Sequence, residues 1–170
     1  MAYTTVSVVE SIFINTSVEE LWNITALQFD KIGLWSAGVK DAIGYGTGFN
    51  GSVCTERQCI PAYKGFKKTT ERIIDYQPDK KQFTYQIAQG LPKMVVEATN
   101  TWTHLEEGNG TKITMEVYME LKGLIGNVMK GPLKKKMSKI LKENLEELKA
   151  YAETGTVHTR KQKLIAQEAK

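Results

Sequence analysis

The chain has 170 residues, of which 41% are hydrophobic and 25% charged, and these fractions are typical of an ordinary globular domain. Its net charge of +4 arises from short clusters of Lys and Arg with neither interleaved aromatic residues nor a known motif, which argues against a nucleic-acid-binding protein. No apolar run is long enough to span a membrane, and the N-terminal residues do not form a signal peptide.

The N-terminal part is predicted to be a strand followed by two short helices. Residues 3–14 alternate and are rich in Val, Ile, Thr and Phe, as is typical of a strand. Ser17 can cap the helix that follows, and Glu20 completes a capping box. A second short helix is expected at residues 29–34. The two helices are too short to form a domain, so we expect them to support one edge or end of a sheet.

Six further strands are predicted, separated by turns rich in Gly, Pro and Asn. Their expected ranges are 39–44, 53–60, 67–76, 82–88, 95–105 and 111–121. The last of them alternates most clearly, because its odd-numbered residues from 113 to 121 are apolar and the residues between them are polar. One buried face and one solvated face are typical of an antiparallel sheet.

The last third of the chain is predicted to be a long amphipathic helix. Apolar residues recur at steps of three and four up to Tyr151, while Lys and Glu fill the opposite face. Pro132 lacks an N–H, so we expect the first turns to be kinked there or to form a separate short helix. From Pro132 to Glu153 the helix would be about 33 Å long at about 1.5 Å per residue. Gly155 is the expected end of this helix.

Together these elements predict an α+β fold: a seven-stranded curved antiparallel sheet, two short helices, and one long C-terminal helix over a cavity. A curved sheet and one straight helix rarely fill the space between them, so an internal cavity is expected. Its predicted lining is Trp102, Met115, Val117, Met129, Leu133 and Met137. The domain is expected to cover residues 1–154. Residues 155–170 are expected to be a C-terminal tail outside the fold, with a short extra helix as one alternative, because few of them are apolar.

Several short motifs follow one another along the chain. They are Val18-Glu19-Glu20-Leu21-Trp22, Gly33-Leu34-Trp35, Thr70-Glu71-Arg72-Ile73, Gly90-Leu91-Pro92, Gly110-Thr111-Lys112-Ile113, and Leu145, Leu148 and Lys149 in the long helix. In this order, over about residues 11–153, they resemble the START/Bet v 1-like helix-grip superfamily (SRPBCC), which includes polyketide cyclase/dehydrase-like proteins. The resemblance implies a domain that binds hydrophobic small molecules. Only some members are enzymes, so it leaves catalysis open.

The alternation of this superfamily implies which polar side chains face the cavity. The inward sets are Ala98, Asn100, Trp102 and His104; Thr69, Glu71 and Ile73; and Glu56, Gln58 and Ile60. The superfamily's plant hormone receptors line their pocket with a lysine of the second strand and a glutamate of the fourth strand. Lys40 and Glu71 are similar in position, so we expect them to orient a polar end of an apolar ligand. A structural ion pair or solvated rim charges are an equally good interpretation. The receptors' gate and latch loops are not reproduced at residues 60–63 and 89–93.

The remaining chemistry is sparse. His104 is expected to be a partly exposed residue at a strand end rather than a general base. Cys54 and Cys59 are too few for a disulfide framework and lack zinc spacing, so we expect no metal, no cofactor and a reduced cytoplasmic protein.

Three function classes follow. The favoured one is a binding or carrier protein for a small hydrophobic molecule (lipid-, polyketide- or isoprenoid-like), present as a monomer or weak homodimer without nucleic acid or an integral membrane segment. The alternatives are a polyketide cyclase/dehydrase-type enzyme in which Glu71, Glu56 or His104 moves protons, and an interaction protein with a filled core. The candidate ligand-binding residues are Lys40, Glu56, Glu71, Tyr85, Trp102, His104, Met115, Val117, Met129, Leu133 and Met137.

Overall fold

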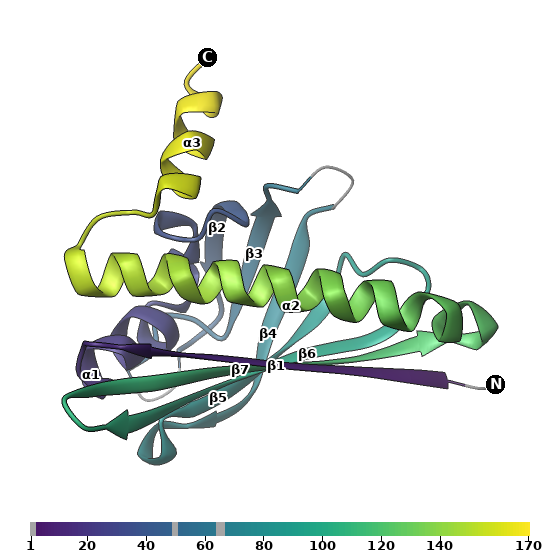
Figure 1. The fold of residues 1–170 in the computed structure, drawn as a ribbon, viewed down its shortest axis with the longest axis horizontal. Coiled ribbons are helices and arrows are strands. Elements are labelled where there is room, and N and C mark those ends of the chain that lie inside the picture. Colours follow the sequence, from purple (N-terminus) through teal and green to yellow (C-terminus); the bar gives the residue numbers. More distant parts are fainter. Residues whose placement is uncertain (1–2, 49–50, 64–66) are drawn as a thin grey trace.

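A computed structural model describes residues 3–48, 51–63 and 67–170, the side chains of residues 124 and 125 excepted. Its centre is one seven-stranded antiparallel sheet in the order β1-β7-β6-β5-β4-β3-β2. The long helix α2 lies across this sheet (Figure 1). The strands are β1 (Tyr3–Ile14), β2 (Val39–Tyr45), β3 (Glu56–Pro61), β4 (Thr69–Gln77), β5 (Gln82–Gln89), β6 (Val95–Glu107) and β7 (Gly110–Lys122). The predicted α+β helix-grip architecture is confirmed.

The short helices lie at one end of the sheet. Helix α1 (Val18–Trp22) begins at Ser17, whose side chain accepts a hydrogen bond from the Glu20 N–H at 3.3 Å, as its capping sequence predicts. The chain continues through one π-helical turn, η1 (Asn23–Leu27), and a 3₁₀ helix, η2 (Phe29–Leu34). Trp22 and Phe29 are buried, and both rings contact Phe83 of β5. These helices therefore close the end of the sheet with aromatic packing.

Helix α2 (Gly123–Thr154) is continuous and includes Pro132 in its interior. No separate helix forms before Pro132, so that alternative is wrong. Pro132 is exposed, which leaves the carbonyl that loses its helical partner near solvent. The buried apolar residues of the second half are Leu141, Leu145 and Leu148. Gly155 ends the helix with a φ of 69°, and its N–H donates to the Tyr151 carbonyl, as expected for a helix C-cap.

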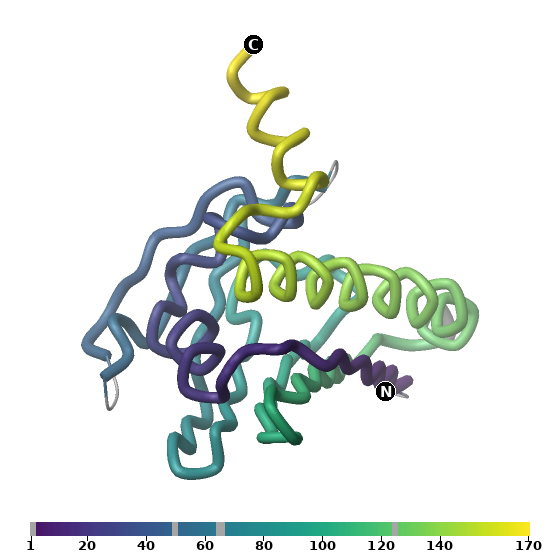
Figure 2. The backbone as a smooth tube through the Cα atoms, turned by 60° about the vertical axis from the view of Figure 1, so that its left-hand side comes forward, coloured from purple at the N-terminus to yellow at the C-terminus, as the bar shows by residue number. Residues whose placement is uncertain are grey.

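Residues 155–170, expected to be a tail outside the fold, contain helix α3 (Thr159–Glu168). The helix projects away from the domain and approaches it at its N-terminal end (Figures 1 and 2). There the buried Lys161 ammonium donates to the Val39 carbonyl at 2.8 Å. This hydrogen bond joins the first turn of α3 to β2. The number of apolar residues in the segment did not predict it. Across the described ranges, no helix combines the length and apolar character needed to cross a membrane.

Candidate functional site

A cavity of about 380 Å³ lies between α2 and the inner face of the sheet. Apolar side chains make up most of its wall. They include Ile87, Ala98, Met115, Val117 and Met119 from the sheet and Leu133, Met137 and Ile140 from α2. The odd-numbered residues of β7 face inward as their alternation predicts, because a buried strand face repeats every two residues. The cavity wall is therefore apolar both on the side of the sheet and on the side of α2.

Strand β3 presents the opposite face to the one expected from the sequence. Arg57 and Cys59 are buried and border the cavity, whereas Glu56 and Gln58 are only half-buried and Ile60 is exposed. The prediction that Glu56 faces the cavity is wrong. A shift of one residue moves every side chain of a strand to the other face. The run Glu-Arg-Gln carries polar residues at consecutive positions, so its alternation gave no guide to the face.

The polar centre of the cavity is a buried ion pair between Arg57 and Glu71. Glu71 Oε2 accepts from Arg57 Nε at 2.7 Å and lies 2.6 Å from Nη2. Arg57 Nη1 donates to the Phe29 carbonyl at 2.6 Å, and the guanidinium lies 3.9 Å from the centre of the Phe29 ring. Burial acts to lower the pKa of Arg57, but the attraction and hydrogen bond of the Glu71 carboxylate, with smaller contributions from Cys59 and Tyr85, together outweigh it and the pKa rises. The pair is therefore charged and internally neutralised.

Lys40, the expected cation, does not reach the cavity. Val39 borders the cavity, and a β-bulge at Val39–Asp41 interrupts the ladder at this point. The Lys40 side chain is exposed and its ammonium lies 3.3 Å from a carboxylate oxygen of Glu168 on α3. The proposed Lys40–Glu71 pair is thus wrong, because the residue that follows an inward Val39 points outward and Arg57 occupies the partner position.

Tyr85, Asn100 and Trp102 form the wall beside the ion pair. Asn100 Nδ2 donates to the Tyr85 hydroxyl oxygen at 2.9 Å, and both side chains are buried. Burial, and then the nearby Glu71 carboxylate, raise the pKa of the Tyr85 hydroxyl. Trp102 stacks on Phe83 with ring centres 6.1 Å apart. Tyr85 and Trp102 therefore lie where the sequence placed them.

His104 is buried and lies outside the cavity wall, so the expectation of a partly exposed residue is wrong. Its Nδ1 donates to the Lys81 carbonyl at 2.8 Å, and its Nε2 lies 2.7 Å from the Thr25 hydroxyl. Burial lowers the pKa of His104 to about 4. A neutral imidazole held between two protein partners is a structural element of the aromatic cluster around Trp22.

Most of the apolar lining predicted from β7 and α2 borders the cavity, namely Met115, Val117, Leu133 and Met137. Met129 does not. It lies in the first turns of α2, before the helix reaches the cavity at Leu133, and 40% of its surface is exposed. Helical spacing put Met129 and Leu133 on one face, but only the tertiary structure shows where along α2 the cavity begins.

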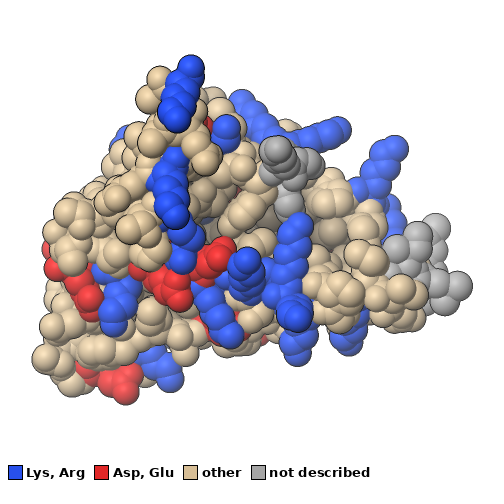
Figure 3. Space-filling view, turned by 45° about the horizontal axis from the view of Figure 1, so that its top comes forward, with Lys and Arg blue, Asp and Glu red and all other residues tan. Residues whose placement is uncertain are grey.

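The cavity is also bordered by residues of the two segments that correspond to the receptors' gate and latch loops. Pro61 and Tyr63 border it from one loop, and Leu91 and Pro92 from the other. Lys136 borders it from α2. Figure 3 shows Lys and Arg side chains gathered along α2 and α3 around a hollow on this face.

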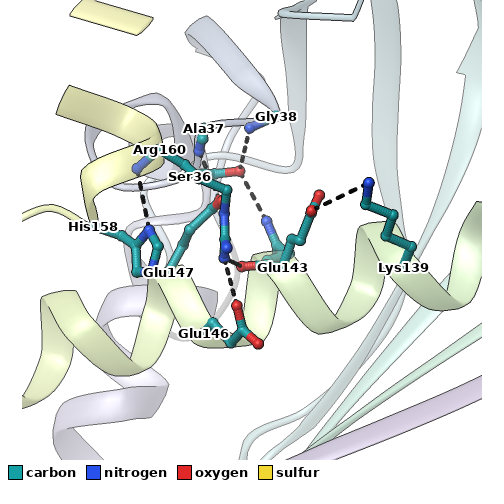
Figure 4. Close-up of polar contacts among 10 residues, drawn as sticks. Ser36, Ala37, Gly38, Lys139, Glu143, Glu146, Glu147, His158 and Arg160 are labelled. Carbon is teal, nitrogen blue, oxygen red and sulfur yellow. Dashed lines mark hydrogen bonds and ion pairs between the residues drawn. The ribbon is translucent and has the colours of Figure 1, made fainter. Parts of the chain in front are cut away.

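A second group of polar side chains closes the cavity beside α3. Asn144 Nδ2 donates to Ser36 Oγ at 2.8 Å, and Glu147 Oε2 accepts from the Ala37 N–H at 2.7 Å. Arg160 of α3 donates from Nε to Glu147 Oε1 at 2.7 Å (Figure 4). Ser36, Asn144 and Glu147 all border the cavity. Helix α3 therefore supports a wall of the cavity through Glu147.

Comparison with known proteins places the chain in a family. A family model described as "Polyketide cyclase / dehydrase and lipid transport" matches residues 5–153. The chain belongs to this family. No match was found among curated protein sequences.

Solved structures of this polyketide cyclase/dehydrase and lipid transport family's fold are similar in shape and distant in sequence. A START superfamily protein from Mycobacterium smegmatis has a TM-score of 0.72 and 16% identity, with 88% of this chain and 99% of that chain covered. The di-domain ARO/CYC StfQ from the steffimycin biosynthetic pathway has a TM-score of 0.71 and 16% identity, with 88% and 51% covered. A protein from Thermus thermophilus has a TM-score of 0.64 and 15% identity, with 95% and 98% covered. At these identities the likeness establishes the fold.

Sequence reasoning missed Arg57, which is the central cation of the site. One signal was available: a turn was expected after Pro61, between strands 53–60 and 67–76, and this would have placed Arg57 within about two positions of Glu71 across the two strands. The observed register pairs Arg57 with Glu71 and Glu56 with Arg72. Opposite charges directly across two antiparallel strands attract each other. The same register leaves open which of the two pairs is buried.

Proposed function

We propose that the protein binds a small hydrophobic molecule (lipid-, polyketide- or isoprenoid-like) in the cavity beneath α2 and acts as its binding or carrier protein. The observation that carries this proposal is an apolar cavity of about 380 Å³ that contains one neutralised ion pair. Ligand pockets generally measure about 300–1,000 Å³ and combine apolar walls with a few fixed polar groups. The family's description includes lipid transport, which supports the same function.

Binding is favoured over cyclase or dehydrase chemistry by the positions of the proton-transfer candidates. Of Glu56, Glu71 and His104, only Glu71 borders the cavity. Its carboxylate is already engaged by Arg57 in two contacts of 2.7 and 2.6 Å. Glu71 Oε2 is therefore held by the guanidinium and is not free to take a proton from a substrate. An interaction protein with a filled core is disfavoured by the cavity itself.

The test is a pair of tryptophan substitutions on α2. Met137→Trp adds bulk to the cavity wall, whereas Met129→Trp adds the same bulk outside the cavity on the same helix. Binding of the neutral apolar fluorophore N-phenyl-1-naphthylamine is followed by fluorescence titration. We expect Met137→Trp to weaken binding at least about tenfold, a loss of about 1.4 kcal/mol, and Met129→Trp to leave it within about twofold of the original protein.

An original protein that does not bind the fluorophore would refute the proposal. Equal effects of the two substitutions would mean that the fluorophore binds elsewhere, and would refute the assignment of the cavity. Native mass spectrometry of the purified protein provides a second measurement, because a retained apolar molecule would appear as a mass increment that Met137→Trp removes.

A further inference from the structure

Three residues that border the cavity have a buried polar atom without a hydrogen-bond partner among the described residues: Asn100 (Oδ1), Trp102 (Nε1) and Asn144 (Oδ1). Asn144 lies on α2, whereas Asn100 and Trp102 lie together on β6. Asn100 and Trp102 are 6% and 2% exposed. They are two positions apart on β6, so their side chains share the inner face of the sheet. Buried polar atoms in native proteins are nearly always paired, and leaving them unpaired costs free energy. A donor for Asn100 and an acceptor for Trp102 are therefore expected from the molecule that occupies the cavity.

The charge around these atoms decides what kind of group can serve them. Each of the three guanidinium nitrogens of Arg57 already has a protein acceptor, which is Glu71 for Nε and Nη2 and the Phe29 carbonyl for Nη1. A ligand carboxylate at this depth would find its cation neutralised and would face two acceptors, Glu71 and Asn100 Oδ1. Burying an unpaired carboxylate is strongly unfavourable. The part of the cavity beside Asn100, Trp102 and the Arg57–Glu71 pair, here called its inner end, therefore disfavours ligands with a carboxylate at that position.

We propose that the inner end of the cavity is a subsite for an uncharged hydroxyl group, such as the phenol or alcohol of an otherwise apolar molecule. A hydroxyl is both donor and acceptor, so it matches Asn100 Oδ1 as donor and Trp102 Nε1–H as acceptor. This inference rests on the proposed function, because it concerns the ligand of the same cavity. It goes further in naming the polar group and in excluding a carboxylate at that end.

Three probes with one skeleton test the subsite: naphthalene, 2-naphthol and 2-naphthoate, titrated at pH 7 by calorimetry or fluorescence. The first has no polar group, the second an uncharged hydroxyl and the third a carboxylate. We expect 2-naphthol to bind about tenfold more tightly than naphthalene, since each hydrogen bond to a buried partner contributes several-fold in affinity. 2-Naphthoate should bind more weakly than both.

Substitutions then locate the effect. Trp102→Phe removes the N–H and keeps an aromatic ring, and Asn100→Leu removes the acceptor at similar volume. Each should reduce the affinity for 2-naphthol about fivefold to tenfold and change that for naphthalene by less than about twofold. The matched control is Trp35→Phe. Trp35 is equally buried and its Nε1 is also unpaired among the described residues, but it does not border this cavity. It should leave the preference for 2-naphthol unchanged.

The outcomes separate this inference from the proposed function. A protein that binds N-phenyl-1-naphthylamine but shows no preference for 2-naphthol over naphthalene, including no binding of either, overturns the subsite and leaves the binding function intact. Tighter binding of 2-naphthoate than of 2-naphthol also overturns it. So does a preference that survives both Trp102→Phe and Asn100→Leu. A protein that binds none of the four probes refutes the proposed function as well.

Discussion

Glu71→Gln tests whether the loss of one partner of the Arg57–Glu71 pair destabilises the protein as much as is usual for a buried ion pair. The substitution keeps the size of the side chain and removes its charge. The Arg57 side chain is 4% exposed and that of Glu71 is 12% exposed, so the guanidinium would be left without a counter-charge and with little water. Removing one partner of a buried pair generally destabilises a protein by about 3–5 kcal/mol. Glutamine still accepts one hydrogen bond from Arg57, so we expect the lower end, about 3 kcal/mol.

The neighbouring positions of the same two strands supply a matched control. Glu56 accepts from Arg72 at 2.8 Å, directly beside the Arg57–Glu71 pair in the β3–β4 register, but on the other face of the sheet. The Arg72 side chain is 58% exposed. Exposed pairs contribute about 0–1 kcal/mol, so Glu56→Gln should change stability by less than about 1 kcal/mol. The two variants have the same chemistry and differ in burial.

The measurement is urea unfolding of ligand-free protein. With a slope of about 2 kcal/mol per molar urea, a loss of about 3 kcal/mol lowers the midpoint by about 1.5 M for Glu71→Gln, against less than about 0.5 M for Glu56→Gln. The double substitution Arg57→Met with Glu71→Met should restore stability to near the original, because it removes both charges at once. Equal midpoints for Glu71→Gln and Glu56→Gln would refute the reasoning, and would mean that water in the cavity solvates Arg57.

Two further predictions concern stability. Because burial lowers the pKa of His104 from 6.5 to about 4, the unfolded chain binds the proton first, and stability falls as the pH falls through that interval. Between pH 7.5 and pH 5 the free energy of unfolding of the original protein, measured by urea titration, should therefore fall by about 2 kcal/mol more than that of His104→Gln, at about 1.4 kcal/mol per pKa unit. Parallel pH profiles of the two proteins would contradict this prediction. Arg160→Ala leaves the buried carboxylate of Glu147 without its cation, so we expect a loss of about 1–3 kcal/mol and a Tm lower by about 3–8 °C in calorimetry. Lys163→Ala, exposed on the same helix, is the control, and an equal Tm for the two variants would show that α3 does not support the cavity wall.

The sequence alone determined the parts of this protein that depend on local periodicity. The apolar positions of residues 113–121 repeat every two residues, so Met115 and Val117 were placed on the inner face of β7 without knowledge of any neighbour. The stripe of α2 likewise predicted that Leu133 and Met137 face the sheet. The succession of strands and helices along the chain followed from the turn residues and from the alternation of apolar and polar residues. In each case one face is apolar and the other polar, so burial has a single solution.

Tertiary structure decided the rest, where local patterns allow two solutions. Strand β3 has charged residues at both Glu56 and Arg57, and only its packing beneath α2 and against Phe29 shows that Arg57 is the buried one. Lys40 and His104 had plausible positions along the chain. Lys40 follows the inward-facing Val39 and is exposed, and the short helices bury His104. Which charged side chain lies in the cavity depends on which residues pair across the strands and on which face of the sheet is covered. These contacts join residues that are distant in sequence, so the local periodicity does not encode them.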